Sequence, residues 1–178
     1  ARDAAIELLP GIAAMTNLHP LFVHFPIVLL PLFFVMDVLG AITKKDAWRA
    51  YASLLLYTGT AFALVTVVTG LLAAKSVPHG EAVHEIMETH EHLAILILLL
   101  SATLSVWRIN MQKAVQESVH YVFLSFAGLV ALLLIFTADL GGLMVYQHGV
   151  AVTPVMQSHE QIQAAGQHAH EPGHAHGE

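Results

Sequence analysis

Four apolar stretches, each long enough to cross a lipid bilayer, dominate the sequence and restrict what it can fold into. They run approximately from Leu21 to Ile42, from Tyr51 to Ala74, from His92 to Ile109 and from Val119 to Tyr146. A hydrocarbon core of about 30 Å takes about 20 helical residues to cross, and lipid offers no partner for backbone polar groups. Short links join consecutive stretches, which makes neighbouring helices antiparallel. The sequence therefore predicts an all-α fold, an integral membrane four-helix bundle of up-down-up-down topology.

The composition agrees with a membrane protein and excludes several classes of function. Apolar residues make up 56% of the 178 residues and charged residues 11%, and the mean hydropathy is +0.67. With 7 Lys and Arg against 13 Asp and Glu, the chain lacks the basic surface of a nucleic-acid binder. It has no cysteine, which excludes disulfides, Cys-ligated iron–sulfur clusters and covalently attached c-type haem.

The chain divides into three parts: an outer N-terminal segment over 1–17, a transmembrane domain over 18–150, and a flexible His-rich tail over 151–178. No internal repeat is evident. Cations gather in the links after the first and third spans, with Lys44, Lys45 and Arg49 in one and Arg108 and Lys113 flanking the other. The positive-inside rule places these links in the cytoplasm. We therefore expect a multi-pass protein of the bacterial inner membrane with both termini on the periplasmic side.

Histidines are unusually frequent, and their depth in the predicted bundle is asymmetric. The chain has 13, and those near the spans lie almost entirely at the outer ends of the helices: His19, His24, His79, His84, His90, His92 and His148, with His120 alone at the inner side. Ionisable side chains at membrane depth are costly and commonly mark a functional site. His24 is the strongest candidate, because its neighbours from Phe22 to Ile27 are apolar. The alternative is that His24 bonds a carbonyl freed by a nearby proline.

The approach to the third span offers a second group of candidate ligands. His84, Glu88 and His92 are four residues apart and share one helix face, as a divalent-metal site requires. The alternative is a solvated acidic helix start, which the helix dipole favours. His90 and His92 diverge by about 200° on a helix, so only one of them points to the bundle axis. The sequence leaves open which one does.

Glycines and a helix end complete the candidate site. Gly59 and Gly70 lie on a stripe of small residues along the second span, which leaves room for a flat cofactor or, alternatively, for close helix packing. His148 lies at the end of the fourth span, beside Gly149, where it can turn inward as a substitute ligand or a partner for a cofactor carboxylate.

Several of these residues form motifs that resemble a known family. The run from Leu18 to Ile27, a histidine before the third span, and Asp139 with Gly141, Gly142, Tyr146 and His148 to Val150 are similar to a family of bacterial four-helix membrane proteins of unknown function. The resemblance covers about Leu18 to Val152. It implies genes close to those of c-type cytochromes and the binding of b-type haem.

Three functions are consistent with these observations. The first is a membrane-bound b-type cytochrome-like electron-transfer subunit, with one haem b near the outer face, held by His24 and by His92 or His90. Its partners would be the lipid bilayer, a periplasmic c-type cytochrome or other redox subunits, and quinone. The second is a metal-binding protein for copper, zinc or nickel, using His24, His84, Glu88 and His92. The third is a cofactor-free assembly subunit of a redox complex. The sequence leaves open whether the chain is an enzyme.

Overall fold

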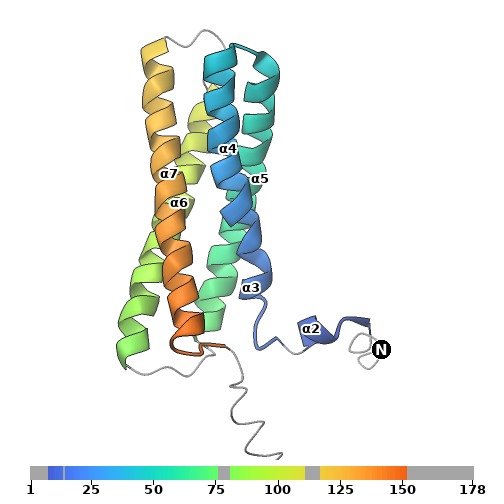
Figure 1. Cartoon of the computed structure of the whole chain (residues 1–178), viewed down its shortest axis with the longest axis vertical. Coiled ribbons are helices and arrows are strands. Elements are labelled where there is room, and N and C mark those ends of the chain that lie inside the picture. Colours follow the sequence, from blue (N-terminus) through green and yellow to red (C-terminus); the bar gives the residue numbers. More distant parts are fainter. Residues whose placement is uncertain (1–7, 14, 76–80, 111–116, 152–178) are drawn as a thin grey trace, which may run out of the picture.

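Four long helices run side by side along one axis in the computed structural model (Figure 1). The structure describes residues 8–13, 15–75, 81–110 and 117–151. The first helix is in two parts, α3 (His19–Phe22) and α4 (His24–Thr43), and is followed by α5 (Asp46–Ala74), α6 (Glu81–Asn110) and α7 (Glu117–Tyr146). A short helix, α2 (Pro10–Ala13), lies beside the bundle. The predicted all-α membrane bundle is confirmed, and most of the tail over 151–178 and residues 1–7 lie outside the described residues.

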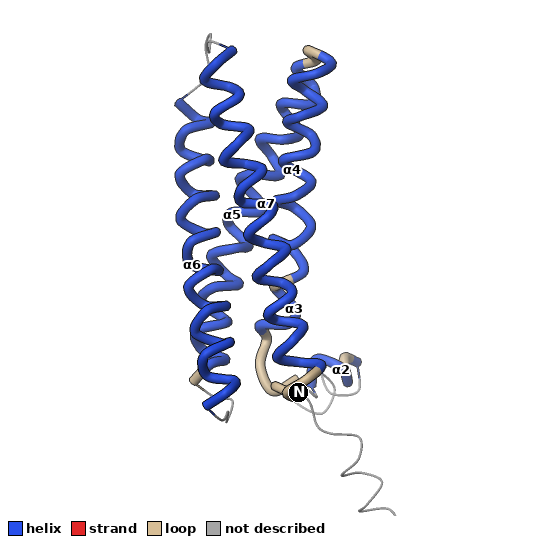
Figure 2. Tube along the Cα trace, turned by 60° about the vertical axis from the view of Figure 1, so that its left-hand side comes forward, coloured by secondary structure: helices blue, strands red, loops and turns tan. Residues whose placement is uncertain are grey.

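The helices form a ring in which each contacts its neighbours in the chain. α4 packs on α5, α5 on α6, α6 on α7, and α7 closes the ring against α4. Within the described residues, α4 and α6 therefore lie on one diagonal of the bundle and α5 and α7 on the other (Figure 2). Antiparallel order brings the start of α3, the start of α6 and the end of α7 to the same end of the bundle.

Prolines explain why the first helix is divided. Pro26 has no N–H to donate to the carbonyl of Phe22, four residues earlier, so that carbonyl needs another partner. The hydroxyl of Thr66 on α5 donates to it at 3.1 Å. The helical course nevertheless continues, because the N–H of Val23 donates to His19 and that of Ile27 donates to Val23. The first span thus begins at His19, two residues before the predicted start, and includes that histidine.

Apolar side chains fill the interior. The buried core contains Leu30, Phe33, Ala52, Leu56, Ile97, Leu104, Phe123, Ala127, Val130 and Leu134. Large apolar side chains are also exposed along all four long helices, which fits a surface that faces lipid rather than water. The bundle therefore has an apolar interior and an apolar exterior, as expected for membrane helices.

The two helical hairpins, α3/α4 with α5 and α6 with α7, repeat each other with an offset of 71 residues. The buried positions of the first hairpin fall on buried positions of the second at this offset: Pro26 and Ile97, Leu30 and Ser101, Phe33 and Leu104, Ala52 and Phe123, Leu56 and Ala127, Gly59 and Val130, Ala63 and Leu134. The buried ion pair of Asp37 and Arg108 joins two positions with the same offset. An approximate twofold axis along the bundle accounts for this pattern.

This internal repeat corrects the expectation from sequence. Most equivalent positions in the core share burial but not residue type. Phe123, for example, is equivalent to Ala52, and both are fully buried. Close packing requires that the total volume of the core side chains fills the interior, and it does not fix the residue type at each position. The repeat of the core is therefore visible in which positions are buried and not in their residue types.

Candidate functional site

Two histidines face each other near the end of the bundle where α3 begins, and they define the candidate site. His19 comes from α3 and His90 from α6, so they lie on diagonal helices. Their ring centres are 6.5 Å apart and their planes cross at 86°. We call His19, His90 and the two threonines that hold them, Thr66 and Thr137, the histidine layer.

Each histidine is held by a backbone carbonyl of the next helix in the chain. Nδ1 of His19 lies 3.1 Å from the carbonyl oxygen of Thr66 on α5, and Nδ1 of His90 lies 2.9 Å from that of Thr137 on α7. A carbonyl oxygen only accepts, so Nδ1 must carry the proton in both rings. In the neutral imidazole this leaves a lone pair on Nε2. Within the described ranges, neither Nε2 atom has a hydrogen-bond partner.

Glycines make these contacts sterically possible. A Cβ atom placed on Gly70 would lie 2.9 Å from Cε1 of His19, and one placed on Gly141 would lie 3.4 Å from Cε1 of His90. Each glycine is four residues after the threonine whose carbonyl holds the same ring. The two halves of the site therefore use one motif, Thr-x-x-x-Gly, on α5 and on α7.

The internal twofold repeat relates the two halves. The sequence separation between histidine and threonine is 47 residues in both hairpins. His19 and His90, Thr66 and Thr137, and Gly70 and Gly141 are all equivalent at the 71-residue offset that joins Asp37 to Arg108. A ligand held by both imidazoles would consequently lie on or near the twofold axis.

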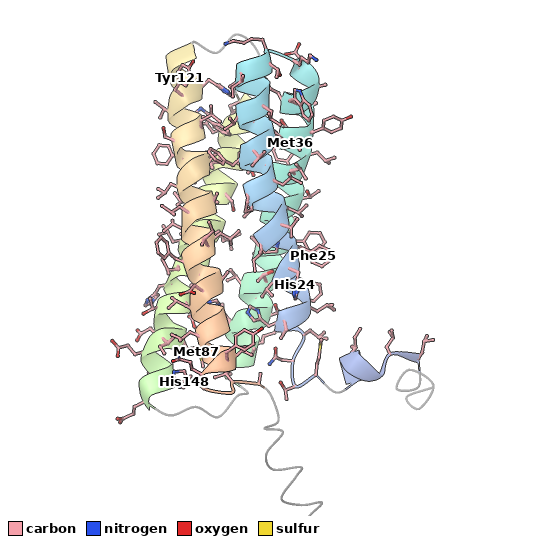
Figure 3. The ribbon with its side chains drawn as sticks, viewed as in Figure 1. His24, Phe25, Met36, Met87, Tyr121 and His148 are labelled. Atoms are coloured by element: carbon pink, nitrogen blue, oxygen red, sulfur yellow. The ribbon has the colours of Figure 1, made fainter. Side chains whose placement is uncertain are left out.

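The residue pair predicted from sequence lies elsewhere on the helices. His24 is exposed on α4, beside the exposed Phe25 (Figure 3). His92 is exposed on α6. His90 is half-buried and points to the partner ring, which answers the question of which of the two faces the interior. The structure thus brings His90 together with His19 rather than with His24.

The other predicted residues are spread over the same end of the molecule. His84 and Glu88 are exposed in the first half of α6. His148, labelled in Figure 3, is exposed just after the end of α7. No group of three His, Asp or Glu side chains suited to a metal ion occurs in the described ranges. The two predicted glycines differ: Gly70 packs on His19, whereas Gly59 packs against Leu29 and Leu30 and serves helix contact.

His19 was not chosen as a site residue from the sequence, because the apolar neighbours of His24 favoured that histidine instead. In the structure His19 begins α3 and Pro20 follows it in the first turn, a position to which proline is well suited. A signal for His19 was present in the sequence: the arrangement His, then Thr-x-x-x-Gly after 47 residues, occurs twice. Without a structure, nothing distinguished this coincidence from the other histidine spacings.

Comparison with known proteins gives one finding that agrees with this architecture. Searches of curated proteins and of solved structures give no match. A family model described as a predicted membrane protein, DUF2231, matches residues 15–154, which include all four spans and the whole histidine layer. The chain therefore belongs to the DUF2231 family of predicted membrane proteins.

Proposed function

We propose that the protein is a membrane-bound b-type haem protein that serves in electron transfer, with His19 and His90 as the two axial ligands. The observation that carries the proposal is the pair of facing imidazoles, each with Nδ1 bonded to a carbonyl and Nε2 without a partner. Metal-ligating histidines characteristically donate the other ring N–H to a carbonyl or carboxylate, which fixes the tautomer and the ring orientation.

The spacing of the two rings supports this assignment. When two imidazoles bind one metal ion from opposite sides, each ring centre lies about 3.2 Å from the metal, which is a metal–nitrogen bond of about 2.0–2.1 Å plus about 1.1 Å from that nitrogen to the ring centre. The two ring centres are then about 6.3 Å apart. The ring centres of His19 and His90 are 6.5 Å apart. Cofactor sites in helical bundles are built from side chains on facing helices, as these are.

The ligand set also favours haem over a bare metal ion. Two neutral imidazoles without carboxylates or thiolates fill only half of the positions around a four-coordinate zinc or copper ion. Haem fills the four equatorial positions itself and needs only the axial pair. Haem would supply reversible one-electron chemistry, and the protein's part is to position the two imidazoles and to fix their orientation through the carbonyls of Thr66 and Thr137.

The distribution of charge supports an orientation in the membrane. Among the described residues, Lys44, Lys45, Arg49 and Arg108 lie at the end remote from the histidine layer, and Lys75 lies at the near end. The positive-inside rule then puts the histidine layer toward the periplasmic side of a bacterial inner membrane. We propose that electrons are exchanged on that side, with a periplasmic redox protein such as a c-type cytochrome, with another redox subunit or with quinone.

An optical spectrum of the detergent-purified protein tests the proposal. Produced with haem available, the wild-type protein should show the Soret and α bands of a six-coordinate b-type haem, with about one haem per chain by pyridine haemochrome assay. His19→Ala and His90→Ala should each lose these bands. His24→Ala and His92→Ala are matched controls on the same two helices and should retain them.

Each of the other results has a clear meaning. Loss of the bands in His24→Ala but not in His19→Ala would refute the ligand assignment. A wild-type protein that binds no haem, even when reconstituted with hemin, would refute the proposed function. Stoichiometric copper, zinc or nickel without a chromophore would support the metal-binding alternative built on His24, His84, Glu88 and His92.

A further inference from the structure

The two halves of the histidine layer are equivalent in the internal repeat, yet they differ at the residue before each glycine. This residue is Thr69 on α5 and Leu140 on α7. Thr69 carries a hydroxyl, whereas the side chain of Leu140 has no polar atom. The histidines, threonines and glycines are identical in the two halves. A comparison of the halves therefore isolates the effect of one hydroxyl group.

Thr69 brings a further donor to the carbonyl that holds His19. Its hydroxyl oxygen lies 3.0 Å from the carbonyl oxygen of Thr66 and 2.9 Å from that of Val65. A carbonyl oxygen only accepts, so the hydroxyl proton is directed at these two oxygens. The Thr66 carbonyl also accepts from Nδ1 of His19 at 3.1 Å. As part of an α-helix it accepts a backbone N–H as well, so three donors compete for its two lone pairs.

The distances in the two halves agree with this competition. Nδ1 of His19 lies 3.1 Å from its carbonyl oxygen, and Nδ1 of His90 lies 2.9 Å from that of Thr137. The longer contact is the one with the extra donor, since Leu140 offers none. Oγ1 of Thr69 is itself 3.5 Å from Nδ1 of His19, at the limit of a hydrogen bond, so the ring N–H is given to the nearer carbonyl. The hydroxyl thus weakens the bond of His19 without replacing it.

The strength of this bond affects how an imidazole acts as a metal ligand. A ring that donates its Nδ1–H to a strong acceptor becomes a stronger electron donor through Nε2. A stronger donor stabilises the oxidised, more positive iron of a haem, so hydrogen bonding to the axial ligands is one means by which proteins set the reduction potential. A carbonyl that is shared with another donor polarises the ring N–H less and has the opposite effect.

We propose that Thr69 makes His19 the weaker electron donor of the two axial imidazoles and thereby raises the reduction potential of the bound haem. This role rests on the haem binding proposed above and assigns control of the potential at that site. Thr69 acts through the carbonyl of Thr66 and the ring of His19, so it is a positioning residue and not a ligand. The twofold repeat would make the two ligands alike, and Thr69 makes them unequal.

A redox titration of the detergent-purified haem protein tests this role. Thr69→Val removes the hydroxyl and keeps the shape of the side chain, so the reduction potential should fall. Leu140→Thr adds a hydroxyl at the equivalent position beside the carbonyl of Thr137, so the potential should rise. The matched control is Thr58→Val, which should leave the potential unchanged, because Thr58 lies on α5 and its hydroxyl bonds only within that helix.

Nuclear magnetic resonance of the haem-free protein tests the hydrogen bond itself. With ¹⁵N-labelled histidine, a ring N–H held by a carbonyl gives a proton signal, and a stronger hydrogen bond moves this signal downfield. The signals of His19 and His90 are assigned by their loss in His19→Ala and His90→Ala. In the wild type the His19 signal should lie upfield of the His90 signal. Thr69→Val should move the His19 signal downfield and leave the His90 signal in place.

The two measurements separate failure of this role from failure of the haem function. A wild-type protein that binds no haem would refute the proposed function and with it the effect on the potential, while the proton signals would still decide whether Thr69 weakens the bond of His19. A haem protein whose potential is unchanged or higher in Thr69→Val would overturn the role of Thr69 and leave the axial pair intact. An unmoved His19 signal in Thr69→Val would overturn it as well. Should Thr69→Val not fold, Leu140→Thr decides the matter, and a potential that does not rise there would count against the role.

Discussion

Replacing Gly70 by alanine should weaken haem binding much more than replacing Gly141, although the two glycines are equivalent in the internal repeat. The new Cβ on Gly70 would lie 2.9 Å from Cε1 of His19, whereas that on Gly141 would lie 3.4 Å from Cε1 of His90. Carbon atoms pack at about 3.5–4.0 Å, so the first contact is too short by about 0.6 Å or more and the second by about 0.1 Å.

His19 cannot move that far without cost, because its ring is held at Nδ1 by the carbonyl of Thr66 at 3.1 Å. A displacement of about 0.6 Å would lengthen this contact beyond the normal range of a hydrogen bond. Overpacking typically costs about 1–3 kcal/mol. If that cost falls on the ligand-bound state, haem affinity should decrease by about 5- to 150-fold, at 1.4 kcal/mol per factor of ten.

The assay is an optical titration of the haem-free protein with hemin in detergent, which gives a dissociation constant for each variant. Both substitutions also gain about 0.5–1 kcal/mol of helix stability from removing a glycine, so Gly141→Ala controls for that effect in Gly70→Ala. We expect Gly141→Ala to stay within about threefold of the wild type, since it needs almost no displacement. Equal dissociation constants for the two variants would show that His19 does not approach Gly70 as described, or that it is not a ligand.

Four further predictions concern the packing of the bundle and the geometry of the two imidazoles. Thr66→Val should lower the free energy of unfolding by about 1–3 kcal/mol, because the carbonyl of Phe22, which Pro26 leaves without an N–H donor, then also loses the Thr66 hydroxyl. The control is Thr58→Val, which should cost less, because the Thr58 hydroxyl bonds only within its own helix. Equal losses of stability for the two variants in a urea titration would contradict this prediction. Asp37→Ala should destabilise by about 3–5 kcal/mol by leaving Arg108 buried without its carboxylate. Because the two positions are equivalent in the internal repeat, the double variant Asp37→Arg with Arg108→Asp should recover part of the free energy of unfolding that Asp37→Ala loses. A double variant that is less stable than Asp37→Ala would argue against the twofold relation. The oxidised haem protein should give the highly anisotropic low-spin electron paramagnetic resonance signal of crossed axial imidazoles, as the 86° angle between the rings requires; a rhombic signal typical of parallel rings would contradict the geometry.

The candidate site could be predicted only in part from the sequence. The concentration of histidines at one end of the spans indicated the end of the bundle at which His19 and His90 face each other, and His90 was among the candidates. Which histidine of the first span faces His90 depends on the direction in which each side chain leaves its helix. His19 and His24 are five residues apart, so they point in directions about 140° apart on one helix. Apolar neighbours made His24 appear buried, but in a membrane bundle the exterior is as apolar as the interior, and apolar flanks say nothing about which way a residue faces.

The sequence by itself determined the four spans, their antiparallel order and the class of protein, because in lipid every backbone polar group must be satisfied within its own helix and length alone then identifies a span. Tertiary structure alone decided which face of each helix turns inward, and with it the pairing of His19 with His90 and of Asp37 with Arg108. It also revealed the twofold repeat, which is retained in the positions of the buried core side chains and, at the histidine layer, in the identities of the histidines, threonines and glycines. The reason is that packing is a property of several helices together, and no single helix sequence contains the volume that its neighbours fill.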